Sequence, residues 1–238
     1  DKGSGSITTL ALADGVVDIP SRIEHLDQGD EVEVQLFGSV QQAALLIEGE
    51  DCPRLEAMTE VLPFEIRVVS TGSRRGAISA EDGVADVAVV SRSEGSGPVL
   101  EETKLEPVGG YARDLVIMAK DPEHLDLGRV EEKRVLGWTR DSEMNRIFRR
   151  VLEGAGSPST QFIGQARSHS AVAASVKAGR ADLGFGVRMA AEEAGLASRK
   201  VATDEILFLV NPEKRGQDSV QAFLGALATE ESRLSQDG

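Results

Sequence analysis

The pattern Gly-x-Ala-Asp occurs twice in this chain of 238 residues, about a hundred positions apart, and each copy opens an apolar stretch. The first copy spans residues 83–90 and the second spans residues 179–186. Each follows a helix-like segment that begins with serine, at 73–79 and at 168–176. The chain thus repeats the order loop, helix, turn and buried strand. This repeat predicts two similar α/β lobes that face one another and close on a small ligand.

Length and composition fit one bilobal domain or two modest domains with enough chain for a core. Apolar residues make up 40% of the chain and charged residues 28%. No apolar run approaches the roughly 20 residues that a membrane-spanning helix needs, and no apolar leader follows the N-terminus. We therefore expect no membrane partner and a cytoplasmic location. The chain starts at Asp1 without a methionine, so we expect a processed protein or part of a longer one.

The formal net charge is −14, with a pI near 4.7. An acidic surface repels the phosphates of DNA and RNA, which argues against a nucleic-acid partner. The acidic residues are dispersed, and the basic residues are 19 Arg and only 7 Lys. This composition resembles that of proteins from salt-accumulating microbes, and an ordinary acidic cytosolic protein is the alternative.

Cysteine and histidine usage argues against disulfide and metal sites. The one cysteine, Cys52, excludes an intrachain disulfide and a multi-cysteine metal site. The three histidines, His25, His124 and His169, lack metal-ligand spacing such as His-Glu-x-x-His. No nucleophile stands at a recognisable spacing from a histidine and an acid, and no phosphate-binding or dinucleotide-binding glycine loop is present. We therefore predict no catalytic residue, no metal and no cofactor in this chain.

Residues 1–38 have the pattern of a short β segment that pairs with strands outside this chain or packs against the residues after 38. Residues 31–37 alternate polar and apolar, which is typical of a half-buried antiparallel strand. The segment resembles the C-terminal end of the MoeA family, molybdopterin molybdotransferases that insert molybdate into molybdopterin. The resemblance rests on Ser4-Gly-Ser, then Leu10-Ala-Leu-Ala-Asp-Gly-Val-Val-Asp-Ile-Pro, then Gly29-Asp-Glu-Val-Glu-Val-Gln-Leu. It implies a molybdotransferase parent whose catalytic domains lie upstream of Asp1.

The rest of the chain, 39–238, is predicted to form an α/β domain with its first lobe at 39–110 and its second at 111–204, followed by a C-terminal strand and helix at 205–238. Continuous apolar runs are typical of strands that are covered on both faces. We expect strands at 43–47, 64–69, 85–90, 114–119, 133–137, 161–164 and 205–210. We expect helices at 53–61, 143–153, 189–194 and 219–228.

The loop Ser70-Thr71-Gly72-Ser73, followed by Arg74, is the clearest chemical feature of the first lobe. It lies between a predicted strand and a predicted helix, so it offers hydroxyls, backbone N–H groups and the positive end of a helix to an anion. Arg74 adds a full charge. The alternative is that Ser73 only caps its helix.

The order of these motifs in 39–238 resembles the periplasmic-binding-protein-like domain, which is similar to the substrate-binding domain of LysR regulators and to molybdate- or tungstate-binding proteins. The resemblance rests on Gly72-Ser73, Ser168-His-Ser-Ala-Val-Ala and the two Gly-x-Ala-Asp copies. It implies a bilobal type II fold, which in one archaeal and bacterial group is fused directly behind MoeA.

The resemblance also implies a second anion loop, usually rich in glycine, at 138–146. Here the glycines are absent, and Asp141 and Glu143 are present instead. Two carboxylates oppose a divalent anion, so the affinity would be reduced or the ligand changed. Thr139, Arg140 and Ser142 still supply donors. Ser168 and His169 begin the second serine-led helix; His169 could donate to an anion, or could be a satisfied histidine at a helix start.

The repeated aspartates, Asp86 and Asp182, could suggest a catalytic carboxylate pair. Their place after Gly-x-Ala favours a structural role in the turn, and we predict that role.

The preferred hypothesis is a non-catalytic binding domain of a molybdenum-cofactor biosynthesis protein. Its ligand would be molybdate, tungstate or a pterin phosphate such as molybdopterin, held between the three loops. One alternative is the exported binding protein of an oxyanion transporter. Another is the effector-binding domain of a LysR-like regulator, whose helix-turn-helix this chain lacks. The complete open reading frame would separate these hypotheses.

Overall fold

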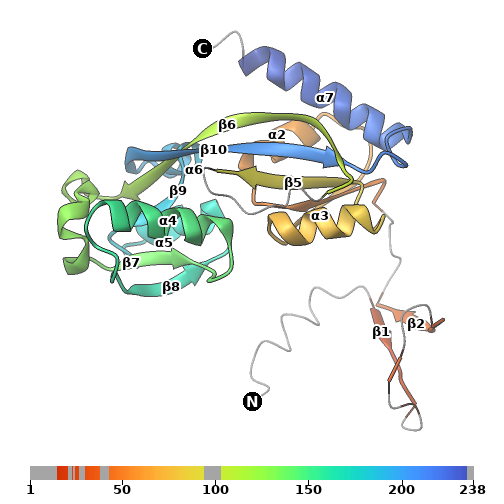
Figure 1. Cartoon of the computed structure of the whole chain (residues 1–238), viewed down its shortest axis with the longest axis horizontal. Helices are drawn as coiled ribbons and strands as arrows, with labels where there is room; N and C mark the ends of the chain where they lie inside the picture. Colours follow the sequence, from red (N-terminus) through yellow and green to blue (C-terminus); the bar gives the residue numbers. More distant parts are fainter. Residues whose placement is uncertain are drawn as a thin grey trace. The chain divides into compact units, whose positions relative to one another are not determined.

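The structure is a computed structural model, and it describes residues 15–20, 23, 25–26, 30–37, 43–93 and 103–234 (Figure 1). The chain divides into two compact units, Asp1–Gln42 and Ala43–Gly238. Part of the MoeA-like segment, residues 4–14 and Gly29, lies outside the described residues.

The first unit contains a two-stranded antiparallel sheet, formed by β1 (Gly15–Val17) and β2 (Val34–Leu36). The strand predicted at 31–37 is therefore shorter than expected. Its predicted half-burial is wrong, because every residue from 31 to 37 is exposed. Two strands provide no second apolar layer, so alternation along one strand does not produce a buried face.

The second unit repeats one order of elements (Figure 1). Five elements form the first set: β3 (Leu45–Gly49), α2 (Pro53–Thr59), β4 (Ile66–Ser70), α3 (Ser73–Glu81) and β5 (Val87–Arg92). Five more form the second set: β7 (Val135–Trp138), α4 (Glu143–Gly154), β8 (Phe162–Ala166), α5 (His169–Lys177) and β9 (Gly184–Val187). The predicted repeat is confirmed, since each Gly-x-Ala-Asp copy lies between the last helix and the last strand of its set.

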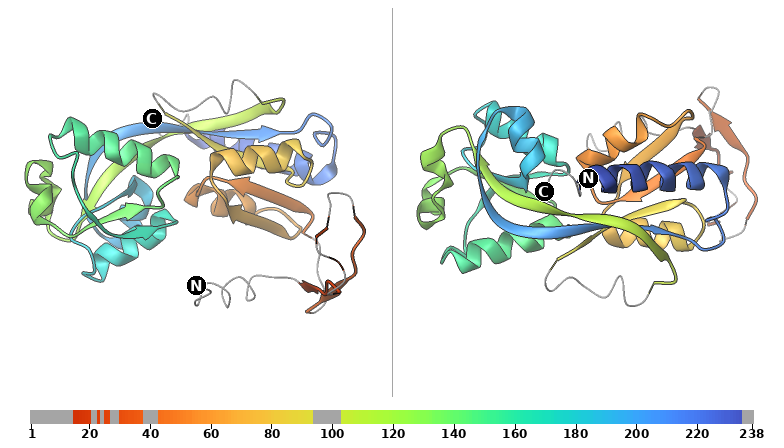
Figure 2. Two further views of the ribbon diagram at one scale, coloured as in Figure 1. Left: turned by 60° about the horizontal axis from the view of Figure 1, so that its bottom comes forward. Right: turned by 90° about the horizontal axis from the view of Figure 1, so that it is seen from above.

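Two long strands connect the lobes, β6 (Glu106–Ala119) and β10 (Ala197–Val210), and they pair antiparallel along their length (Figure 2). The main sheet has the order β4-β3-β5-β10-β6-β9, while β7 pairs with β8 and forms a bridge to the residue before β9. We predicted only 114–119 and 205–210 as strands. The remaining halves of these two strands, 106–113 and 197–204, contain polar residues or glycine and have no continuous apolar run. They are strands because each pairs with the predicted half of the other strand through backbone hydrogen bonds. The predicted lobe limits at 110 and 204 therefore lie inside β6 and β10.

Each lobe has its own core. In the first lobe, α2 and α7 (Asp218–Leu234) cover one face of the sheet, and α3 covers the other. Phe223 and Leu227 of α7 pack there with Leu45 and Ile47 of β3. The second lobe also contains α6 (Arg188–Ala194) and the 3-10 segments η2 (Pro122–Leu125) and η3 (Leu127–Glu132). Its core includes Phe148, whose ring stacks on two other phenylalanine rings. No helix in the described ranges is both long and apolar enough to cross a membrane.

The two Gly-x-Ala-Asp turns have the same geometry. Gly83 has φ +73° and Gly179 has φ +70°, a region that favours glycine. The Oδ2 atom of Asp86 accepts from the backbone N–H of Leu46, and Oδ2 of Asp182 accepts from that of Arg134, both at 2.8 Å. Each aspartate amide donates in return to the carbonyl of the same partner. The predicted structural role of the aspartates is confirmed.

Replacing Asp182 by asparagine should lower the free energy of unfolding by about 1 kcal/mol, because the Arg134 side chain loses a charged acceptor at the half-exposed turn. Urea unfolding would measure the change. Glu193→Gln on the exposed side of α6 is the matched control, and its effect should stay within about 0.5 kcal/mol. Equal effects of the two variants would contradict a structural role for the carboxylate.

Candidate ligand-binding cleft

A cleft with a volume of about 1320 Å³ is lined by both lobes of the second unit. The first lobe contributes the loops after β3 and β4 and the start of α3; the second contributes the loop between β7 and α4 and residues near the end of β8. Eight of the ten predicted ligand residues line it: Ser70, Thr71, Gly72, Ser73, Arg74, Thr139, Arg140 and Ser142. The structure therefore brings the first two predicted loops together. Ser168 and His169 are not among the lining residues.

At the start of α3, a carboxylate of the chain takes the position predicted for an anion. Glu50 follows β3 and is 7% exposed. Its Oε1 atom accepts from the Ser73 backbone N–H at 2.9 Å and from the Ser73 hydroxyl at 2.8 Å. The hydroxyl in turn accepts from the backbone N–H of Ser91. The alternative that Ser73 caps its own helix is wrong, because α3 begins after Gly72 without a side-chain cap.

Two backbone donors of this loop are also bonded within the chain. The backbone N–H groups of Thr71 and Gly72 both donate to the carbonyl of Gly49, at 2.9 and 2.8 Å. The Thr71 hydroxyl oxygen differs, because it is buried and has no hydrogen-bond partner in the part of the chain that the structure describes. Such an atom costs free energy until water or a ligand satisfies it.

The second loop has its hydroxyl occupied as well. The Ser142 hydroxyl donates to the carbonyl of Thr139 at 2.8 Å and accepts from the N–H of Asn145, so it caps α4. Glu143 is only 6% exposed. It accepts from the Ser93 hydroxyl of the first lobe and forms an ion pair with Arg146. The carboxylate predicted at the mouth of the site is therefore part of the contact between the lobes.

His169 is fully buried, and the prediction that it donates to an anion is wrong. Its Nδ1 atom accepts from the N–H of Val187 at 3.3 Å, and its Nε2 atom lies 3.4 Å from a guanidinium nitrogen of Arg113. Its ring packs against Trp138 in a T-shaped arrangement. Burial, and secondarily the Arg113 charge, lower the pKa of His169 well below its ordinary value. Of the two readings, the structure supports a histidine buried at a helix start, with one ring nitrogen accepting from the N–H of Val187. Ser168 caps α5 by accepting from the N–H of Ala171.

A second carboxylate occupies the start of α5. The Oδ2 atom of Asp51, on the loop after β3, accepts from the His169 backbone N–H at 2.6 Å. Asp51 belongs to the first lobe and α5 to the second. Any separation of the lobes at this point breaks the bond.

A buried ion pair connects the two long strands beside the cleft. Asp204 of β10 lies opposite Arg113 of β6 and accepts from its Nε at 2.8 Å and from its second terminal nitrogen at 3.0 Å. The Ser91 hydroxyl donates to the same carboxylate, and Arg113 also donates to the carbonyl of Asp51. Burial alone lowers the pKa of Arg113, but the Asp204 carboxylate outweighs it and holds the pKa above its ordinary value. The guanidinium therefore stays charged.

Glu50 and Asp51 change what the helix starts can bind. An anion beside either carboxylate, at about 4 Å and an effective dielectric constant of about 20, meets a repulsion of about 4 kcal/mol for each pair of unit charges. The helix N-terminus contributes only about 0.3–1 kcal/mol in return. Repulsion therefore exceeds the attraction of the helix start while both residues are ionised.

Five exposed arginines line the cleft, and one of them, Arg146, is paired with Glu143. Of the other four, Arg74 and Arg75 of α3 face it from the first lobe, and Arg140 and Arg167 from the second. All four are exposed, and within the described ranges their side chains form no hydrogen bond or ion pair. No group of three His, Cys, Asp or Glu residues in those ranges could hold a metal ion.

Glu50, Asp51, Gln165 and Arg167 line the cleft but were not predicted. One signal was present in the sequence. Glu50 and Asp51 come three and four positions after the apolar run 43–47, and Ser70 directly follows the next predicted strand. Parallel neighbours such as β3 and β4 end at the same edge of a sheet, and ligands bind outside the carboxyl ends of strands.

Two family models match the chain. The PBP superfamily domain matches residues 55–228, and the MoeA C-terminal region (domain IV) matches residues 1–37. A comparison with curated proteins found no match.

Solved structures share the fold of the second unit. The bromide-bound regulatory domain of HypT from Salmonella typhimurium has a TM-score of 0.59 at 12% identity, over 79% of this chain and 95% of that one. The regulatory domain of CrgA, a LysR-type regulator from Neisseria meningitidis, has a TM-score of 0.56 at 15% identity, over 78% and 97%. PhnD1 from Prochlorococcus marinus, in complex with methylphosphonate, has a TM-score of 0.53 at 12% identity, over 78% and 82%.

Identities this low show the fold alone, and that fold is the predicted α/β type II periplasmic-binding-protein-like one. The family match covers most of the chain and includes both Gly-x-Ala-Asp turns and the cleft lining from Ser70 to Arg167. The chain therefore belongs to the PBP superfamily.

Proposed function

We propose that this domain binds a small anionic molecule in its cleft and serves as a non-catalytic sensor domain of a molybdenum-cofactor biosynthesis protein. The proposed ligand is a pterin phosphate such as molybdopterin, with molybdate and tungstate as smaller alternatives. The MoeA match at residues 1–37 supports this setting, with molybdotransferase catalytic domains as the proposed neighbours of the domain.

The observation that carries the proposal is the placement of four exposed guanidinium groups in one cleft. Arg74 and Arg75 come from one lobe, Arg140 and Arg167 from the other. The cleft lining also carries carboxylates, at Glu50, Asp51, Glu81, Asp141 and Glu143. The support for an anionic ligand is therefore that these four arginines have no partner among the described residues and remain available to an anion. Arginine binds phosphate and carboxylate through paired N–H donors. The HypT regulatory domain and PhnD1, which share the fold, hold bromide and methylphosphonate.

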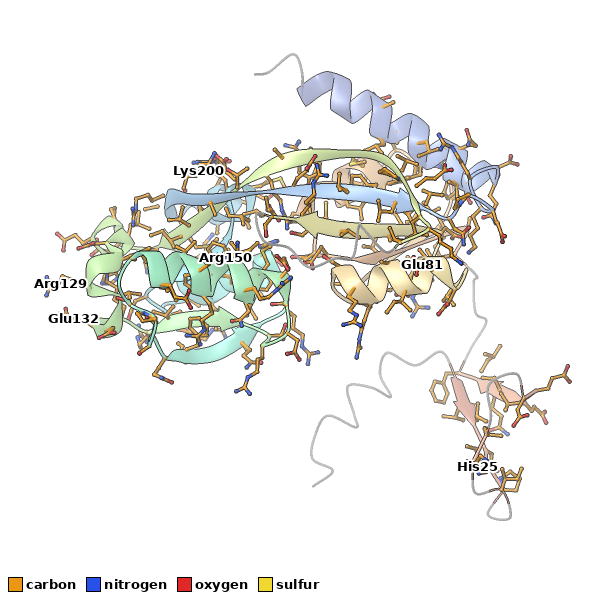
Figure 3. The ribbon with its side chains drawn as sticks, in the orientation of Figure 1. His25, Glu81, Arg129, Glu132, Arg150 and Lys200 are labelled. Atoms are coloured by element: carbon orange, nitrogen blue, oxygen red, sulfur yellow. The ribbon has the colours of Figure 1, made fainter. Side chains whose placement is uncertain are left out.

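Calorimetric titration of the chain with a phosphorylated pterin, molybdate, tungstate and sulfate tests this function. Arg140→Ala should weaken the binding of a phosphorylated pterin about tenfold, which corresponds to about 1.4 kcal/mol. Arg129→Ala is the matched control, because Arg129 is an exposed arginine on η3 outside the cleft lining (Figure 3). It should leave the affinity unchanged. A folded chain that binds none of these anions would show that the proposal is wrong.

A second candidate function has its own support. The HypT and CrgA domains are regulatory domains, and CrgA is a LysR-type regulator, so an effector-binding role is consistent with this fold. An exported binding protein is a third candidate, supported by PhnD1. Sequencing the complete gene separates them: a molybdotransferase body supports the first function, a helix-turn-helix the second, and an export or lipid-anchor segment the third.

A further inference from the structure

We infer that the cleft selects an extended organic anion with two or more separated charged groups over a small inorganic oxyanion. The inference rests on the proposed function and specifies the chemical class of its ligand. It follows from two sets of side chains that differ in burial and in bonding: the carboxylates of Glu50 and Asp51 and the arginines of the cleft.

The carboxylates occupy the places where a tetrahedral oxyanion would bind. Glu50 accepts both donors of Ser73 at the start of α3, and Asp51 accepts the His169 N–H at the start of α5. The amides of Thr71 and Gly72 are used by the carbonyl of Gly49. A bare oxyanion at either helix start therefore meets negative charge and finds these donors already bonded. These two acids act as internal substitutes for a ligand's anionic group.

The four arginines other than Arg146 favour a larger ligand. They lie on both lobes, are exposed, and have no partner in the described ranges, so each can still bind an anionic group. A tetrahedral oxyanion is far smaller than the cleft of about 1320 Å³ and would leave most of it to water. An organic molecule with anionic groups at separate positions can engage Arg74 or Arg75 on one side and Arg140 or Arg167 on the other. Once one anionic group is bound, the other is held close to its arginine, so the two contacts together give a higher affinity than either alone.

A matched pair of probes tests the selectivity of the 238-residue chain. Fructose 1,6-bisphosphate carries two separated phosphates and fructose 6-phosphate carries one; molybdate represents the small oxyanions. Calorimetry should give a Kd for the bisphosphate at least tenfold below that for the monophosphate and at least a hundredfold below that for molybdate. Molybdate binding as tight as that of the bisphosphate would overturn the inference.

A variant tests the role of Glu50. Glu50→Gln keeps the shape and one acceptor of the side chain but removes its charge, so molybdate should bind at least tenfold more tightly than to the wild type. Glu81→Gln is the matched control, because Glu81 also lines the cleft but lies at the opposite end of α3 (Figure 3). It should change the molybdate affinity less than twofold. An equal gain in both variants would mean that net charge, not the occupied helix start, excludes molybdate.

The two kinds of failure are distinguishable. If wild type and Glu50→Gln bind molybdate equally well and more tightly than the bisphosphate, this inference is wrong and the proposed anion-binding function stands. If neither binds any of the three probes or a phosphorylated pterin while circular dichroism shows that both are folded, this inference and the proposed anion-binding function are both overturned.

Discussion

Replacing Asp204 by alanine should lower the free energy of unfolding by about 3–5 kcal/mol, because it leaves the buried guanidinium of Arg113 without its countercharge. The side chain of Asp204 is 0% exposed and that of Arg113 is 6% exposed, so water cannot replace the lost carboxylate. The Ser91 hydroxyl loses its acceptor as well. Urea unfolding, followed by circular dichroism, measures the change.

Two further variants distinguish charge burial from simple loss of contacts. Asp114→Ala, on the neighbouring position of β6, removes a half-exposed carboxylate that pairs with Arg188 and Lys200 and should cost about 1 kcal/mol or less. The double variant Arg113→Met with Asp204→Leu removes both charges and should recover most of the stability that Asp204→Ala loses. A double variant as unstable as Asp204→Ala alone would contradict the explanation.

Acidification from pH 6.5 to pH 5 should destabilise the chain through His169 by up to about 1.4 kcal/mol per pH unit. A second ring proton would sit on the nitrogen that accepts from the N–H of Val187 and would remove that hydrogen bond. Burial, together with the nearby Arg113 charge, holds the folded pKa well below the ordinary value. In the unfolded chain the histidine binds a proton near pH 6.5. Below that pH the unfolded state binds more protons, so stability falls as pH falls, until the pH reaches the folded pKa.

Urea unfolding at a series of pH values measures this slope. His169→Gln should be less stable than the wild type at pH 8, because it loses packing against Trp138. Its stability should, however, change little between pH 6.5 and pH 5. A wild-type stability that stays constant over this range would show that His169 is not the titrating group.

Much of the first lobe could be predicted from local pattern. The apolar pattern located β3, β4 and β5 to within a few residues. The reason is clearest for β3 and β5, which lie inside the sheet, where strands covered on both faces are continuously apolar. The glycines of the two Gly-x-Ala-Asp turns had a local reason as well, since their backbone has positive φ. The C-terminal helix was predicted, but its packing on the first lobe was not, because that contact joins residues far apart in sequence.

The candidate site, too, was predicted only in part. The loop at 70–73 was predicted because it lies between a strand and a helix, and the loop at 138–146 because of the family resemblance. Eight of the predicted residues line the cleft. The hydrogen bonds that already use the donors at the two helix starts could not be predicted. Glu50 is 23 residues from Ser73, and Asp51 is 118 residues from His169.

The sequence by itself determined a two-lobed α/β fold, the turns that close each lobe, and the hydroxyl-rich loop of the first lobe that lines the cleft, because these depend on hydrophobic runs, glycine conformation and the positions of strand ends. The tertiary structure alone decided which donors in the cleft loops are still available to a ligand. The physical reason is that hydrogen bonds between distant segments form only when the lobes pack. That packing places Glu50 and Asp51 at the two helix starts, buries His169, and leaves the arginines of the cleft exposed.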